Sequence, residues 1–129
     1  IVLESVYPTV TEAVHNRIRM RMGFLHHVVA PLLLIQLYPR LGISPNQLCP
    51  IDGLTHIKCP ILIASGDRDE HTPIDETNRM FETANKPKRL VKFEAAGHVD
   101  LLAHDPSKYE DEIIGYLNQI IGERIGGAE

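Results

Sequence analysis

The sequence has little cysteine, no excess of positive charge and no apolar run long enough to cross a membrane. Two cysteines, Cys49 and Cys59, are too few for a disulfide framework and favour a reducing compartment, with one bridge between them as the alternative. We therefore expect a cytoplasmic protein. A net charge of −4 makes nucleic acid an unexpected partner. The longest apolar run, Phe24 to Leu37, is shorter than the roughly 20 residues of a membrane span, so we expect it to be buried and expect no membrane association.

The remaining composition is typical of one soluble domain. Of the 129 residues, 43% are hydrophobic and 23% are charged, which is enough apolar material for a core. The chain begins directly with the strand-like residues Ile1 to Glu4, without an initiator methionine or a targeting segment. We therefore expect the sequence to be part of a longer protein.

Short apolar runs bounded by turn residues predict three strands, at Ile1 to Leu3, Pro60 to Ala64 and Leu90 to Phe93. Because helical patterns alternate with them, we predict a three-layer α/β fold, with a short parallel sheet of about three strands flanked by helices. A sheet this narrow exposes an edge at the first strand. We therefore expect edge-strand self-association, most simply a homodimer that pairs the first strands.

Two helices are predicted before the second strand. Thr9 and Glu12 form a capping box for a helix from Val10 to Met22, and Gly23 offers a C-cap. Pro31 suits the first turn of a helix that runs to about Tyr38. The segment that follows, residues 42–58, contains two prolines and two glycines, so we predict a surface loop.

Two further helices are predicted after the second strand. Thr72 is a candidate N-cap, with Pro73 at the first helical position. Asp105 followed by Pro106 begins the last helix in the same way, and its apolar stripe ends at Ile121.

Charged side chains collect in the two loops that follow the second and third strands, residues 66–73 and 96–100. In an open parallel sheet, functional groups gather at the carboxyl ends of the strands. Neighbouring strands lie about 4.8 Å apart, so a carboxylate of one loop can reach a histidine of the other. An acid that orients a histidine is the supporting half of a catalytic triad.

The segment PILIASGDRDEHTP, residues 60–73, followed by Gly97-His98, resembles the last third of an α/β-hydrolase fold enzyme. The resemblance extends over the whole chain. IVLES and YPTVTEAVHNRIRMRMG, from residues 1 and 7, are similar to the sixth strand and its helix in bacterial serine hydrolases of the S33-type aminopeptidase and esterase group. PLLLIQLYPRLGISPNQLCPID, from residue 31, is similar to their cap insertion.

The resemblance implies one partial domain, residues 1–129, and roles for two residues. Its parts are a strand and helix (1–23), a cap-like insertion (24–58) and the acid- and histidine-bearing part (59–129). It assigns the catalytic acid to Asp69 and the base to His98. Asp67 competes for the acid role, but Asp69 has the family's spacing to Thr72-Pro73, and we assign Asp67 to the turn.

The nucleophile of this family is missing from the sequence. None of the serines (Ser5, Ser44, Ser65 and Ser107) lies in a Gly-x-Ser-x-Gly elbow, and the glycine-rich segment of the oxyanion hole is absent as well. We expect the parent protein to hydrolyse a carboxylic ester or small amide without a cofactor, and this chain alone to be inactive. The alternative is a truncated, non-catalytic module for binding or self-association.

Simpler interpretations accompany these assignments. Asp69 and His98 could merely cap helices and satisfy turns, His71 is interpreted as a turn residue, and Asp100 and His104 as supports of the histidine loop. His26 and His27 could face a substrate pocket. A zinc site from Cys49, His56 and Cys59 lacks a recurring spacing and a fourth ligand, so we predict no metal.

Overall fold

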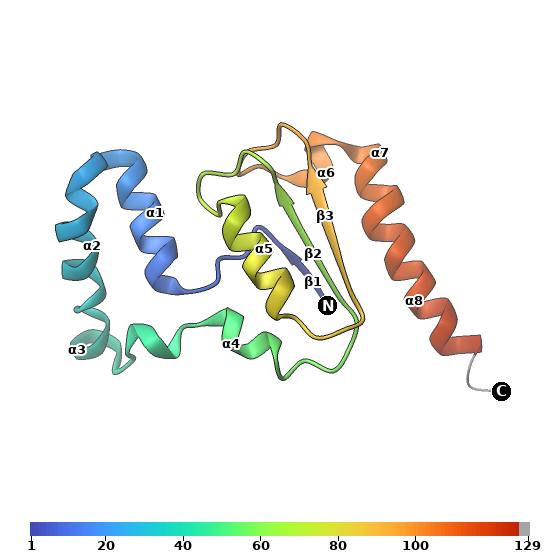
Figure 1. Ribbon diagram of the computed structural model, residues 1–129, viewed down its shortest axis with the longest axis horizontal. Helices are drawn as coiled ribbons and strands as arrows, with labels where there is room; N and C mark the ends of the chain where they lie inside the picture. The colour runs from blue at the N-terminus through green and yellow to red at the C-terminus, as the bar shows by residue number, and fades with distance from the viewer. Residues whose placement is uncertain (127–129) are drawn as a thin grey trace.

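The computed structural model describes residues 1–126, and the side chains of residues 1–122. Its centre is a parallel sheet in the order β1-β2-β3, with helices on both faces, which confirms the predicted α/β class (Figure 1). The strands are β1 (Val2–Glu4), β2 (Ile61–Gly66) and β3 (Lys88–Phe93). Each overlaps its predicted segment.

The middle strand separates two layers of core. Because side chains alternate along a strand, Leu62 and Ala64 pack on one face with Phe93 and Ile113, below the C-terminal helices. Other β2 residues pack on the opposite face against α5 (Ile74–Thr83) and α4 (Pro50–Leu54), in a cluster formed by Ile61, Ile63, Met80, Ala84 and Leu54. Burial on both faces explains why β2 has no polar alternation.

Helix α1 (Val10–Met22) has the predicted bounds. The Thr9 hydroxyl accepts a hydrogen bond from the Glu12 N–H at 3.1 Å, and Gly23 ends the helix with a φ of 54°. A positive φ carries little steric cost at glycine. The predicted N-cap at Thr9 and C-cap at Gly23 are therefore confirmed. The Glu12 carboxylate accepts from the Thr9 hydroxyl at 3.0 Å, which differs from the reciprocal backbone bond of a capping box.

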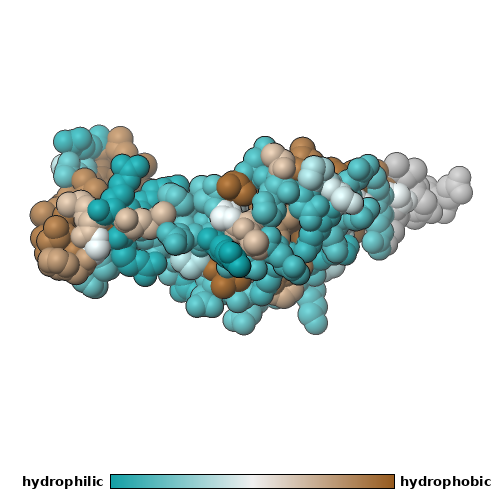
Figure 2. All heavy atoms as spheres, turned by 90° about the horizontal axis from the view of Figure 1, so that it is seen from above, coloured by the Kyte–Doolittle hydropathy of each residue, from teal (hydrophilic) through white to brown (hydrophobic). Residues whose placement is uncertain are grey.

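The apolar run after α1 differs from its prediction. It forms η1 (Gly23–Leu25), α2 (His26–Leu34) and α3 (Leu37–Leu41), with Pro31 inside α2 and not in a first turn. Within α2 only Ala30 and Leu34 are buried. The expectation of a buried run is therefore wrong. Figure 2 shows hydrophobic side chains on the end of the molecule that α2 and α3 form, and those at least 48% exposed are Phe24, Val28, Leu32, Leu33, Ile35, Tyr38 and Leu41.

The helical segment Val10–Leu41 is long and apolar enough to cross a membrane by length and composition alone. The chain reverses direction between α1 and α2, which lie side by side (Figure 1). Length and composition do not distinguish a membrane span from other apolar helices. The absence of membrane association therefore stays a prediction.

The segment predicted as a surface loop contains two short helices instead. These are η2 (Pro45–Gln47), which Ser44 caps together with Gln47, and α4. Both begin with proline at a first helical position, where its missing N–H is not needed. The prolines that indicated a loop therefore start helical turns.

Of the two remaining predicted N-caps, Thr72 is wrong and Asp105 is confirmed. Helix α5 begins at Ile74 after Pro73, and the Thr72 side chain does not cap it but bonds to Asp69. Asp105 does cap the next helix, by accepting from the Lys108 N–H at 3.0 Å. The last helical segment is interrupted and consists of α6 (Leu101–His104), α7 (Pro106–Tyr109), the π-helical η3 (Glu110–Ile114) and α8 (Gly115–Gly126).

Candidate active site

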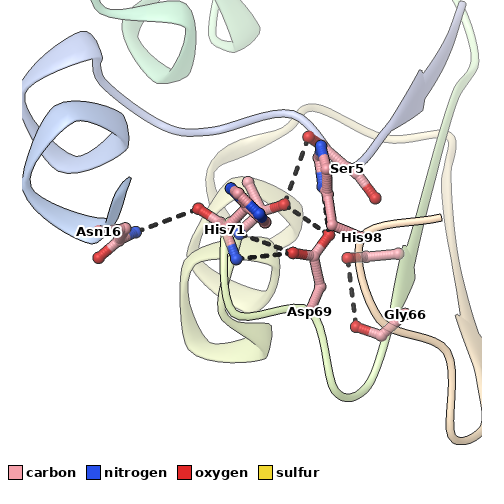
Figure 3. Close-up of polar contacts among 8 residues, drawn as sticks. Ser5, Asn16, Gly66, Asp69, His71 and His98 are labelled. Atoms are coloured by element: carbon pink, nitrogen blue, oxygen red, sulfur yellow. Dashed lines mark hydrogen bonds and ion pairs between the residues drawn. The ribbon is translucent and has the colours of Figure 1, made fainter. Parts of the chain in front are cut away.

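The two loops beyond β2 and β3 meet at the carboxyl edge of the sheet, as Figure 3 shows. There the Nδ1 atom of His98 lies 2.9 Å from Oδ2 of Asp69. The two residues are 29 positions apart in sequence, and the parallel β2–β3 pairing brings them together. The structure thus joins the two residues that the sequence nominated as acid and base.

Asp69 is only 3% exposed, and every bond to its carboxylate comes from a donor. Its Oδ1 accepts from the backbone N–H of His71 at 2.8 Å and of Thr72 at 3.0 Å. Its Oδ2 accepts from the Thr72 hydroxyl at 2.8 Å as well as from His98. A buried carboxylate with this many donors is stabilised in its charged form.

The pKa of Asp69 is lowered by this environment. Burial opposes ionisation and would raise the pKa, but the hydrogen bonds together outweigh it. The backbone N–H of Thr72 makes the largest of these contributions, followed by the His98 ring, the Thr72 hydroxyl and the backbone N–H of His71. Asp69 is therefore a carboxylate at neutral pH and can only accept the proton on Nδ1 of His98.

The other ring nitrogen of His98, Nε2, is not used in this bond. The His98 side chain is 40% exposed, and within residues 1–126 no hydrogen-bond partner lies on Nε2. Because Nδ1 donates to Asp69, neutral His98 carries its lone pair on Nε2. An imidazole nitrogen without a partner, on an oriented and partly exposed side chain, can act as a general base.

Gly66 permits the close approach of the two loops. An added Cβ there would lie 2.2 Å from the carbonyl oxygen of Ala96 and 2.8 Å from that of Gly97. The backbone N–H of Arg68 donates to the same Ala96 carbonyl at 2.9 Å. Backbone therefore packs on backbone next to His98, and no side chain fits between the loops.

Asp67 lies outside this pair. Its backbone N–H donates to the Phe93 carbonyl at 3.0 Å, so it helps to form the turn after β2. Its side chain lines a cavity of about 650 Å³, which Arg19, Arg68 and Glu70 also line, and within the described residues it makes no bond to His98. The geometry thus separates the two competing aspartates, with only Asp69 on the histidine.

Three residues make contacts at this site that the sequence did not predict. Thr72 bonds to Asp69, and its hydroxyl also lies 3.4 Å from the Ser5 carbonyl, just after β1. The His71 ring lies 4.5 Å from the His98 ring between centroids. Asn16 of α1 donates to the His71 carbonyl at 3.3 Å. The Thr-Pro spacing after Asp69 was the available signal for Thr72, whereas nothing local indicates Asn16.

Glu76 supports the acid loop through Asn16, which bonds both to Glu76 and to the His71 carbonyl. Asn16 donates to its Oε1 at 2.7 Å, while Oε2 is buried with no hydrogen-bond partner among the described residues. Burial raises the pKa of Glu76, and the nearby charge of Glu12 adds to the effect, whereas Asn16, Arg79 and Arg19 oppose it. The carboxyl belongs to the α1–α5 interface beneath the candidate site.

The other sequence candidates lie elsewhere. Asp100 caps α6 by accepting from the Ala103 N–H at 3.1 Å, and His104 Nε2 lies 3.0 Å from the Glu94 carbonyl, so both support the histidine loop. His26 and His27 stack on each other in α2. Among the described residues no group of three or more possible ligands could hold a metal, and both cysteines are free.

Comparisons with known proteins agree on the fold. No family model and no curated protein matches the sequence. Among solved structures, an esterase from Pyrococcus furiosus is 16% identical with a TM-score of 0.61, and the match covers 93% of this chain and 44% of that one. A thermophilic esterase from Thermogutta terrifontis is 17% identical with a TM-score of 0.55, over 92% of this chain and 55% of that one.

A monoacylglycerol lipase from Paleococcus ferrophilus is also similar, at 20% identity and a TM-score of 0.51, over 94% of this chain and 58% of that one. The chain therefore has the fold of part of an α/β hydrolase. It spans about half the length of these solved structures.

Replacing Gly66 with alanine tests the close approach of the loops. We expect Gly66→Ala to destabilise the protein by about 1–3 kcal/mol, because the new Cβ overlaps backbone that cannot rotate away. We also expect loss of the His98–Asp69 bond, measured by NMR of the Nδ1 proton. Gly53→Ala in α4 is the control, since a Cβ there meets nothing within 4 Å. Equal stability of the two variants would contradict the packing.

The lowered pKa of Asp69 predicts a pH-dependent contribution to stability. Its ionised form stabilises the fold above the ordinary aspartate pKa of about 3.9, and this contribution is lost as pH falls through the lower folded-state pKa. At pH 7 we expect Asp69→Asn to cost about 1–3 kcal/mol in urea unfolding, because buried donors lose their acceptor. The difference from wild type should narrow below about pH 4.

Asp67→Asn is the matched control for this series. It makes the same chemical change in the same loop, and its side chain has no hydrogen bond within the described residues. Its effect should be small throughout. A cost of Asp69→Asn that stays constant from pH 7 to pH 3 would exclude the carboxylate as its source.

Proposed function

We propose that this chain supplies the acid and the base of a serine hydrolase, which cleaves a carboxylic ester or a small amide. The observation that carries the proposal is the bond between His98 Nδ1 and the buried Asp69 carboxylate, on a histidine side chain that is 40% exposed and whose Nε2 has no hydrogen-bond partner among the described residues. An acid, a correctly oriented histidine and a free Nε2 are what a triad requires besides its nucleophile. The likeness of the fold to solved esterases supports the same reaction class.

In this mechanism His98 Nε2 accepts the proton of a serine hydroxyl as its oxygen bonds to the substrate carbonyl carbon. The imidazolium that forms is stabilised by Asp69, which stays ionised. When the carbonyl reforms, the leaving group departs with the proton from Nε2. A water molecule, activated by His98 in the same way, then releases the acid and restores the serine. These steps need no cofactor.

We propose that the nucleophile and the oxyanion hole come from residues outside this chain. Ser65 is buried in β2 and its hydroxyl lies 3.4 Å from the Gly66 carbonyl, while the Ser5 hydroxyl is buried without a partner among the described residues. Neither bonds to His98 within that part of the chain. The solved relatives are about twice as long, which leaves room for the other half of such a site.

Ester substrates are the first choice within this class. Two of the solved structures are esterases and a third is a monoacylglycerol lipase. The aminopeptidase-like subgroup remains part of the proposal on sequence resemblance alone.

A fluorophosphonate probe tests the proposal directly. We expect no labelling of the 129-residue chain, and labelling of a longer form that includes the residues encoded upstream. His98→Ala in the longer form should reduce the labelling rate by about 10²-fold or more, because the serine loses its base. Mass spectrometry measures the adduct. Labelling of the short chain would contradict an external nucleophile, and failure of the longer form to label would contradict the hydrolase.

A second candidate function is a non-catalytic module that binds or self-associates. The observation in its favour is the edge of β1, which pairs with β2 on one side and with no strand on the other among the described residues. An unpaired edge strand is a template for a further strand. A homodimer that pairs two copies of β1 remains our proposal for the isolated chain.

Sedimentation velocity tests this association. We expect a dimer at micromolar concentration, and a monomer when Glu4→Pro removes a backbone donor that faces the unpaired edge of β1. Leu41→Pro, beyond the sheet at the end of α3, is the control and should leave the dimer unchanged. A wild-type chain that remains monomeric across the concentration range would contradict the association without affecting the catalytic proposal.

A further inference from the structure

A second histidine lies directly against the candidate base. The His71 ring is 4.5 Å from the His98 ring between centroids, at an interplanar angle of 38°. Aromatic rings at this separation attract one another by offset packing. Figure 3 shows His71 beside Asp69 and His98 at the end of the acid loop.

The backbone of His71 is held from both sides. Its N–H donates to Oδ1 of Asp69 at 2.8 Å, and its carbonyl accepts from Asn16 at 3.3 Å. Asn16 is itself fixed by Glu76 at 2.7 Å. Helices α1 and α5 thus hold His71 in place through its main chain, whatever its side chain does.

The side chain of His71 makes no polar contact that explains its position. Its Nδ1 is buried and has no hydrogen-bond partner among the described residues. A proton on Nδ1 would lack an acceptor, so the site favours the tautomer with the proton on Nε2. A buried polar atom without a hydrogen-bond partner lowers the stability of the folded protein. The contact with the His98 ring is the interaction that the His71 ring makes at this position.

His98 needs a neighbour of this kind. Its side chain is 40% exposed, and its bond to Asp69 is one hydrogen bond about which the ring can still tilt. The preceding Gly97 brings no side chain, and a Cβ there would meet only the Arg68 carbonyl, at 3.9 Å. Sequence neighbours therefore do little to orient the imidazole.

We propose that His71 is a positioning residue: its ring forms the wall that holds the His98 imidazole with Nδ1 toward Asp69 and Nε2 outward. The role rests on the proposed function, because an oriented base is needed only for catalysis. It acts through ring packing and not through a nitrogen of His71. Its other surroundings include a cavity of about 550 Å³ that His71 lines together with Arg17, Ile18, Met20, Arg21 and Met22 of α1.

The test is the protection of the Nδ1 proton of His98, measured by NMR as its exchange rate with water in the 129-residue chain. Asp69→Asn should abolish the signal and so assigns it. His71→Leu, which removes the ring but fills space, should accelerate exchange by roughly two- to tenfold, the range that aromatic pair energies imply. His71→Phe, which keeps a ring and no nitrogen, should restore protection to within about twofold of wild type.

Two further variants keep the experiment decisive. His56→Ala, an exposed histidine at the end of α4, is the control and should leave exchange unchanged. His71→Asn is a second ring-free variant, suited to a turn, for use if the leucine variant does not fold. The amide spectrum of β2 and β3 shows which variants retain the sheet.

The possible outcomes separate this role from the function. Unchanged exchange in a folded ring-free variant would overturn the role of His71, and so would fast exchange in His71→Phe, because the nitrogens would then matter. If the wild-type chain shows no Nδ1 proton signal that depends on Asp69, the role of His71 is overturned as well, because the His98–Asp69 bond would then not form in solution. Failure of the longer protein to react with the fluorophosphonate would contradict the hydrolase and leave the exchange result standing.

Discussion

The buried carboxylate of Asp69 is the group on which the rest of the site depends. It accepts from two backbone N–H groups, a hydroxyl and an imidazole, and it is almost fully removed from water. The same bonds that keep it ionised also shape the chain, because they fold residues 69–72 around the carboxylate. The Thr72 hydroxyl lies 3.4 Å from the Ser5 carbonyl just after β1, so bonds around one carboxylate connect the segments that follow all three strands.

Around this group the molecule is divided into a densely packed part and a part with many exposed apolar side chains. The sheet has a dense core on both faces, and Gly66 lets the loops pack backbone to backbone. By contrast, α2 and α3 expose large apolar side chains at the far end of the molecule (Figure 2). Large exposed apolar surfaces of this kind are typical of faces that a partner or a further segment covers.

Much of the fold and site could be predicted from local patterns. The Thr9 cap of α1 and the Asp-Pro start of α7 were predicted correctly, because a cap is a contact among residues three apart in the chain. Pro31 and Thr72 failed for the opposite reason. Pro31 lies inside the nine-residue helix α2 and does not begin it. The Thr72 hydroxyl donates to Asp69 and does not cap α5, because the buried carboxylate, whose burial depends on the whole sheet, accepts its hydrogen bond. Exposure of α2 could not be predicted either, since an apolar segment does not specify what covers it.

The sequence by itself determined the three strands and the parallel α/β class, because strand patterns are local properties. It also placed the candidate residues in the two loops after the strands, and the resemblance to a known family then nominated Asp69 and His98 among them. Only the tertiary structure decided that Asp69 and not Asp67 lies on His98, that Thr72 bonds to Asp69, and that His71 packs on His98. Each of these contacts joins loops that are brought together by the register of β2 on β3 or by the packing of α1 on α5. Register and packing are set by the burial of the whole core, which no short segment encodes.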